Sequence, residues 1–106
     1  MATTEEIQKI TDAIVQTVNP MKVYLFGSYV TGEATPKSDL DFLVIMPDHT
    51  KKKYEVAGMI EKNTRELSHI TKDLIIDYAD KYERFASVPY SFIGHIVKTG
   101  KLLYAS

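Results

Sequence analysis

The stretch from Val23 to Ile45 reads VYLFGSYVTGEATPKSDLDFLVI, and it joins two apolar segments through a polar region. Its first four residues favour a β-strand and are followed directly by Gly27-Ser28. Ten residues later, Asp39-Leu40-Asp41 opens a second apolar run that continues to Met46. The spacing therefore predicts two strands, each with its polar residues at the end nearer the connecting segment.

The second strand is expected over 40–46, and the first over 21–26. Between them we expect a short helical turn at 28–32 and a loop at 32–37, where Gly and Pro are found. The two-residue period of a strand assigns alternate residues to opposite faces. One face then carries Leu40, Phe42, Val44 and Met46, and the other carries Asp41, Leu43 and Ile45. Because the far end is apolar on both faces, we expect this strand to be central and covered on both sides.

Helices are predicted around these strands. Apolar residues at three- and four-residue spacing predict an amphipathic helix over 4–18, capped by Thr3 or Thr4 and stopped by Asn19-Pro20. Gly100 suits the position that follows a helix. The other expected elements are a helix at 50–69, a strand at 73–78, helices at 79–86 and 89–99 that are broken at Pro89, and an extended piece at 102–104.

Length and composition predict one domain over 1–106, of α/β (α+β) class, with a small mixed three- to four-stranded sheet flanked by helices. The formal net charge of −1 gives no reason to expect binding to nucleic acid or to a membrane. Cysteine is absent, which excludes disulfides and thiolate metal sites. With neither a signal-like start nor an apolar run that could span a bilayer, the expected location is cytoplasmic.

Asp39 and Asp41 are the candidate metal ligands. Both lie on one face of their strand, roughly 6.5–7 Å apart, where two like charges repel unless a cation lies between them. Carboxylate oxygens suit Mg²⁺ or Mn²⁺, and Mg²⁺ binds phosphate oxygens as well as protein carboxylates. Gly27 allows close backbone approach to a ligand, and the Ser28 hydroxyl can donate to phosphate. Ser38 is a further candidate for binding phosphate or for capping the turn. Together these residues predict a nucleoside triphosphate site.

The third strand offers a further carboxylate. Asp73 and Asp77 share parity and so point to one face, and we favour Asp73 because it opens its strand as Asp39 opens the second. A calcium loop is the main chemical alternative, but its further alternating acids and closing Glu are missing. No Gly-Lys-Ser/Thr phosphate loop occurs.

At these residues the chain resembles the minimal nucleotidyltransferases of the polymerase-beta superfamily, whose signature is Gly-Ser, ten residues and Asp-x-Asp. Asp73 followed by Leu-Ile-Ile resembles the family's third acid, and the end of the chain resembles its last helix and tail. The resemblance implies that Asp39, Asp41 and Asp73 bind metal and catalyse transfer from ATP. It also implies that Gly27 and Ser28 hold phosphates. Tyr29, inside the motif, is expected to line the nucleotide site.

The acceptor is the part that the resemblance leaves most open. A bare catalytic domain is expected to take its acceptor from a partner, and the resemblance implies a small helical HEPN-type toxin. The chain would then be an antitoxin that attaches AMP to a partner tyrosine. A small-molecule transferase, of the aminoglycoside type, that works with a second subunit is one alternative. A non-enzymatic binding module is another, because Thr31 stands where many relatives carry Arg. Oligomerisation is compatible with all three.

Overall fold

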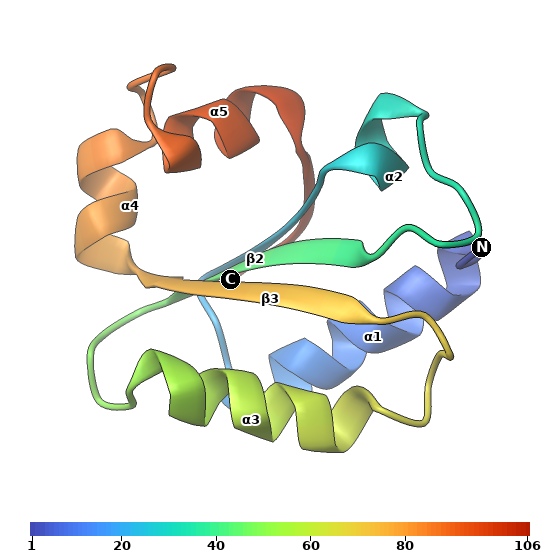
Figure 1. Ribbon diagram of the computed structural model, residues 1–106. Helices are drawn as coiled ribbons and strands as arrows, with labels where there is room; N and C mark the ends of the chain where they lie inside the picture. Colours follow the sequence, from blue (N-terminus) through green and yellow to red (C-terminus); the bar gives the residue numbers. More distant parts are fainter.

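The computed structural model describes residues 1–106 and contains four strands and five helices (Figure 1). The strands are β1 (Lys22–Phe26), β2 (Leu40–Met46), β3 (Lys72–Tyr78) and β4 (Lys101–Ala105). The helices are α1 (Thr4–Val18), α2 (Ser28–Thr31), α3 (Lys53–Thr64), α4 (Ala79–Phe85) and α5 (Phe92–Thr99).

The four strands form one sheet in the order β3-β2-β1-β4. β1 runs antiparallel to both β2 and β4, whereas β2 and β3 are parallel, so the sheet is mixed. β2 is an interior strand, and its residues from Phe42 to Met46 are all buried. The predicted fold class, a small mixed sheet flanked by helices, is confirmed, as is the central position of the second strand.

Helices cover both faces of the sheet, with α1 and α3 on one face and α4 and α5 on the other (Figure 1). The larger core cluster lies on the α1–α3 face and includes Ile14, Phe42 and Ile60. A smaller cluster lies on the α4–α5 face and is built from Tyr24, Leu43, Ile45 and Ile96. Alternate residues of β2 thus enter different clusters, which confirms the predicted division of its two faces.

The N-terminal helix matches its prediction. Thr3 caps α1, because its side chain accepts the backbone N–H of Glu6, while Glu6 Oε1 accepts the backbone N–H of Thr3 in return. At the other end, Asn19 adopts a left-handed conformation with φ of 50°, and its N–H bonds to the carbonyl of Val15. The Asn19-Pro20 stop is therefore confirmed.

The long helix predicted over 50–69 is wrong at both ends, because α3 covers only Lys53–Thr64. At its start, Asp48 Oδ1 accepts the N–H of Thr50 and holds a turn before the helix begins. At its end, the chain leaves the helix after Thr64 in a turn, in which the N–H of Leu67 bonds to the carbonyl of Thr64. The spacing of apolar residues does not predict such local turns, so it gave a helix that is too long.

The helix predicted over 89–99 begins later, at Phe92, so Pro89 lies in the connection rather than at a helix start. Ser91 caps α5 by accepting the N–H of Gly94 at 2.9 Å. Gly100 does end the helix, but with φ of −81° it needs no left-handed conformation. A Cβ there would lie 2.6 Å from the carbonyl oxygen of Ile96, so close packing is what requires glycine.

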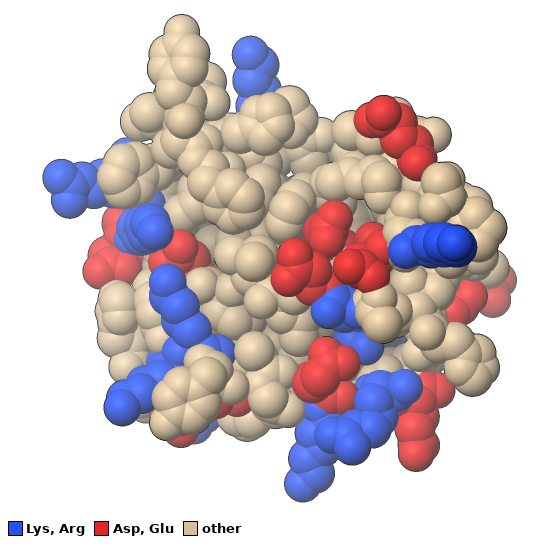
Figure 2. All heavy atoms as spheres, in the orientation of Figure 1, with Lys and Arg blue, Asp and Glu red and all other residues tan.

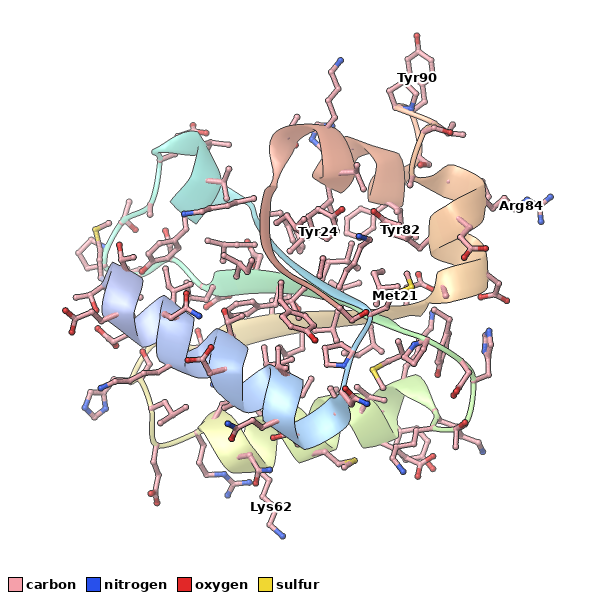
Figure 3. The ribbon with its side chains drawn as sticks, turned by 180° about the vertical axis from the view of Figure 1, so that it is seen from behind. Met21, Tyr24, Lys62, Tyr82, Arg84 and Tyr90 are labelled. Carbon is pink, nitrogen blue, oxygen red and sulfur yellow. The ribbon has the colours of Figure 1, made fainter.

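Two tyrosines fix α4 against the sheet. The hydroxyls of Tyr24 on β1 and Tyr82 on α4 lie 2.7 Å apart, and Figure 3 shows the two side chains directed toward each other. Burial and the hydrogen bond to Tyr82 raise the pKa of Tyr24. The final extended piece predicted at 102–104 is present as β4. No helix is both long enough and apolar enough to cross a membrane.

Candidate active site

Three carboxylates gather at one end of the sheet. The ladders place Asp41 opposite Phe26 of β1 on one side and opposite Asp73 of β3 on the other. Residues paired in this way direct their side chains to the same face, here the face of α4 and α5. Asp39 immediately precedes β2. Figure 2 shows acidic side chains gathered over the ends of β2 and β3 that appear on the right in Figure 1.

Gly27 brings the turn after β1 into contact with Asp41. Its φ of 78° and ψ of −151° lie in a region that only glycine adopts readily. A Cβ built on Gly27 would overlap the Oδ2 atom of Asp41, so the carboxylate packs where any other residue would place its side chain. The structure therefore joins the Gly-Ser turn and the Asp-x-Asp segment physically.

Thr71 positions the first carboxylate. Its hydroxyl donates a hydrogen bond to Oδ1 of Asp39. Its carbonyl also accepts the N–H of Leu40 at 3.0 Å, so the segment before β3 holds both the side chain and the backbone at the start of β2. No spacing rule in the sequence singles out Thr71, because this contact joins residues 32 positions apart.

The electrostatics of this end of the sheet favour a cation. Burial raises the pKa of Asp41 above its usual range, and the charges of Asp73 and Asp39 raise it further. No group of three or more His, Cys, Asp or Glu side chains encloses a metal position by itself. Mg²⁺, however, is usually held by one or two carboxylates together with phosphate oxygens and waters. The all-oxygen donor set of Asp39 and Asp41 fits such a shared site.

The other candidate ligand residues have different surroundings. Ser28 opens α2 beside Gly27, and Thr31 on the same turn is exposed. Ser38 is occupied within the loop, because its Oγ accepts the N–H of Thr35 at 2.8 Å. Tyr29 is not brought to the carboxylates. Its hydroxyl accepts the N–H of Ala2, and its ring packs on the core at the α1–α3 face.

The structure also distinguishes Asp73 from Asp77. Asp73 is exposed and lies in register with Asp41. Asp77 lies at the far end of β3, where it is 6% exposed, and its carboxylate is 3.4 Å from Lys81 and 3.8 Å from Lys53. Asp77 therefore joins β3 to α3 and α4, while Asp73 is the third carboxylate beside Asp41.

Comparison with known proteins identifies the family. The model of the nucleotidyltransferase domain matches residues 6–99, and the chain therefore belongs to this family. The matched region includes Gly27, all three gathered carboxylates and every helix that covers the sheet except the first residues of α1. A comparison with curated proteins gives no significant match.

Solved structures share the fold at low sequence identity. A protein from Sulfolobus solfataricus that is assigned as a nucleotidyltransferase is 17% identical, with a TM-score of 0.63 over 95% of this chain and 78% of that one. A toxin-antitoxin structure with AMP-PNP is 21% identical, with a TM-score of 0.60 over 93% of this chain and 73% of the other. Spectinomycin adenyltransferase AAD(9) from Enterococcus faecialis, solved with ATP and spectinomycin, is 20% identical, with a TM-score of 0.60. This chain is 95% covered in that comparison and spans 48% of the adenyltransferase.

Proposed function

We propose that the chain transfers a nucleoside monophosphate, AMP from ATP, to a hydroxyl acceptor with the help of Mg²⁺ or Mn²⁺. One observation carries the proposal: the glycine turn after β1 packs directly on Asp41, which is flanked by Asp39 and Asp73. This arrangement puts backbone and hydroxyl donors for phosphate next to carboxylates that repel each other unless a cation is bound. Membership of the nucleotidyltransferase domain family supports the same reaction class.

Each residue then has a definite role. Asp39 and Asp41 would hold the cation, which neutralises charge on the phosphates. Gly27 and Ser28 would bind the β- and γ-phosphates. The acceptor oxygen attacks the α-phosphorus, the bond to the β-phosphate oxygen breaks, and pyrophosphate leaves. Asp73 would take the proton of the acceptor hydroxyl. Positioning and charge neutralisation supply most of the catalysis in such reactions.

The acceptor that we propose is a tyrosine of a HEPN-type helical toxin, so that the chain acts as its antitoxin. The carboxylates Asp39 and Asp73 are solvent-exposed, which leaves the site open to a hydroxyl carried by a macromolecule. The fold shared with a toxin-antitoxin structure that contains AMP-PNP supports a partner of this kind.

The test is to incubate the chain with the product of the gene that adjoins its own, ATP and Mg²⁺, and to measure intact masses. We expect the partner to gain the mass of one AMP, located on a tyrosine by peptide mapping. The matched control is the double variant Asp39→Asn/Asp41→Asn, which should produce no gain. Transfer to neither the partner nor any hydroxyl acceptor, while a known active pair reacts alongside, would contradict the proposal.

A second candidate function rests on Thr31. Thr31 is exposed. The resemblance to minimal nucleotidyltransferases implies an arginine at this place, so the chain would lack a cation near the triphosphate. The chain would then neutralise its partner by contact alone. The same double variant separates the two functions, because full neutralisation by Asp39→Asn/Asp41→Asn favours contact, and loss of neutralisation favours transfer.

A further inference from the structure

An aromatic wall stands beside the carboxylates. Phe26 directly precedes Gly27 and faces Asp41 across the β1–β2 ladder. Its ring meets that of Phe92, at the start of α5, edge to face, with centroids 5.8 Å apart and an interplanar angle of 89°. Phe92 is nevertheless 56% exposed, so much of its ring surface is left uncovered. In Figure 2, the surface that rises from the acidic group toward α5 carries no charged side chain.

Phe92 also borders a small hollow between α4 and α5, of about 180 Å³. Pockets that hold whole drug-sized ligands measure roughly 300–1,000 Å³, so this hollow suits a single flat ring system. Its lining consists of Lys81, Phe85, Ser91, Phe92 and Ile93.

The polar groups of the hollow are already used within the protein. The hydroxyl of Ser91 accepts the N–H of Gly94 and donates to the carbonyl of Val88 at 2.7 Å. The ammonium group of Lys81 is paired with Asp77 at 3.4 Å. A ring that enters the hollow therefore meets mainly apolar and aromatic surface, beside a serine hydroxyl and a lysine ammonium that are each engaged within the protein.

The hollow and the phosphate site lie on one face of the sheet, with the Lys81 side of the hollow toward Asp77 at the far end of β3. The contact between Phe92 and Phe26 connects the hollow to the residue that precedes Gly27. Phe26, Asp41 and Asp73 all direct their side chains to the face that α4 and α5 cover. A nucleotide whose phosphates lie at Gly27 and Asp41 therefore has Phe26 and Phe92 as its neighbours on the side of α5. Stacking on aromatic side chains tolerates any base, because every base has a π-face.

We propose that Phe92, supported by Phe26, stacks the base of the bound nucleotide, and that this subsite does not distinguish adenine from guanine. The inference rests on the proposed function and deepens it by assigning a base subsite. Its consequence is that selectivity between ATP and GTP is weak, less than about tenfold, because a base-reading site requires hydrogen-bonding groups that match the base edge.

The test compares binding of magnesium ATP, magnesium GTP and magnesium tripolyphosphate to the purified chain by calorimetry. Phe92→Ala should weaken ATP and GTP binding by about 5- to 20-fold, near the lower end of the range for base–aromatic stacking, since Phe92 offers one open side. Tripolyphosphate, which has no base, should bind within about twofold of wild type. Phe92→Tyr should restore nucleotide binding. Tyr90→Ala is the matched control, because Tyr90 is 98% exposed and projects away from the site in Figure 3.

The outcomes separate the two proposals. Unchanged ATP binding by Phe92→Ala, or equal weakening of ATP and tripolyphosphate, would overturn the base subsite and leave the proposed function standing. Unchanged ATP binding with poorer modification of the partner would assign Phe92 to the acceptor instead. Strong preference of the wild type for one purine would also overturn the inference. Failure of wild type to bind any of the three ligands would overturn both proposals.

Discussion

Replacing Gly27 with alanine should damage both the fold and the site. The φ and ψ of Gly27 lie in a region that costs a non-glycine residue about 1–3 kcal/mol. The new Cβ would also overlap Asp41 Oδ2 and displace that carboxylate, which should destabilise the fold by about 1 kcal/mol more. We therefore expect a loss of about 3 kcal/mol in the free energy of unfolding. At about 4–8 °C per kcal/mol for a domain near 100 residues, the melting temperature should fall by roughly 12–24 °C.

Gly32→Ala is the matched control for backbone strain. Gly32 also has a positive φ, of 84°, but a Cβ there meets nothing within 4 Å. Only the left-handed conformation is then penalised, by about 1–2 kcal/mol. The loss of stability should accordingly be clearly smaller than that of Gly27→Ala.

A double-mutant cycle isolates the contact itself. Asp41→Ala removes the carboxylate that the new Cβ would strike, so Gly27→Ala should cost about 1 kcal/mol less in the Asp41→Ala background. Chemical denaturation of the four proteins, followed by circular dichroism, gives the coupling energy. Additive effects, or equal losses for Gly27→Ala and Gly32→Ala, would refute the claim that Gly27 is required by its packing against Asp41.

Three further predictions test other parts of the structure. Asp41→Asn should raise the melting temperature near neutral pH and lose that advantage in acid. The raised pKa of Asp41 means that the stability of the wild type falls as the pH rises through that pKa, and asparagine does not ionise. Thermal melts of both proteins across pH, without metal, measure the difference, and equal pH profiles would contradict the prediction. Thr71→Val should lower Mn²⁺ affinity in the presence of nucleotide by about 10- to 100-fold, with little change in melting temperature, because Asp39 loses the hydroxyl that orients its carboxylate. Titration calorimetry measures the affinity, and an unchanged value would contradict the prediction. Gly58 lies inside α3 with open space around it, so Gly58→Ala should stabilise the protein by about 0.4–1 kcal/mol. Gly94→Ala should destabilise it by about 1–3 kcal/mol, because the new Cβ would strike the backbone carbonyl of Val88. Denaturation curves in which both changes have the same sign would be inconsistent with this packing.

The sequence was most informative where structure is local. The two-residue period of β2 predicted which side chains enter each of the two core clusters, and Thr3 and Asn19 marked the ends of α1. Errors arose where local hydrogen bonds to the backbone set the boundaries. Ser91 rather than Pro89 caps α5, a bond to Asp48 holds the turn before α3, and a backbone turn after Thr64 follows that helix.

Gly27, Asp41 and Asp73 were each singled out from the sequence, but their mutual alignment was not. The spacing of Gly27 and Asp41 indicated that they act together, but the alignment of Asp73 with Asp41 depends on the parallel pairing of β2 and β3. No local pattern specifies that pairing. Thr71 reaches Asp39 from a distant position and carries no motif, and Phe92, which we propose as part of the base subsite, carries none either. Tyr29 lies within the motif yet turns to the opposite face, because its side chain follows the one-turn helix α2 rather than the strand.

A crystal structure with Mn²⁺ and a non-hydrolysable nucleoside triphosphate would test whether the carboxylates and the Gly27 turn form a nucleotide site, with anomalous scattering used to locate the metal. We expect a manganese peak bound by carboxylate oxygens of Asp39 and Asp41, with the β- and γ-phosphates at the turn of Gly27 and Ser28. A nucleotide bound elsewhere, or a metal that contacts none of the three carboxylates, would contradict it.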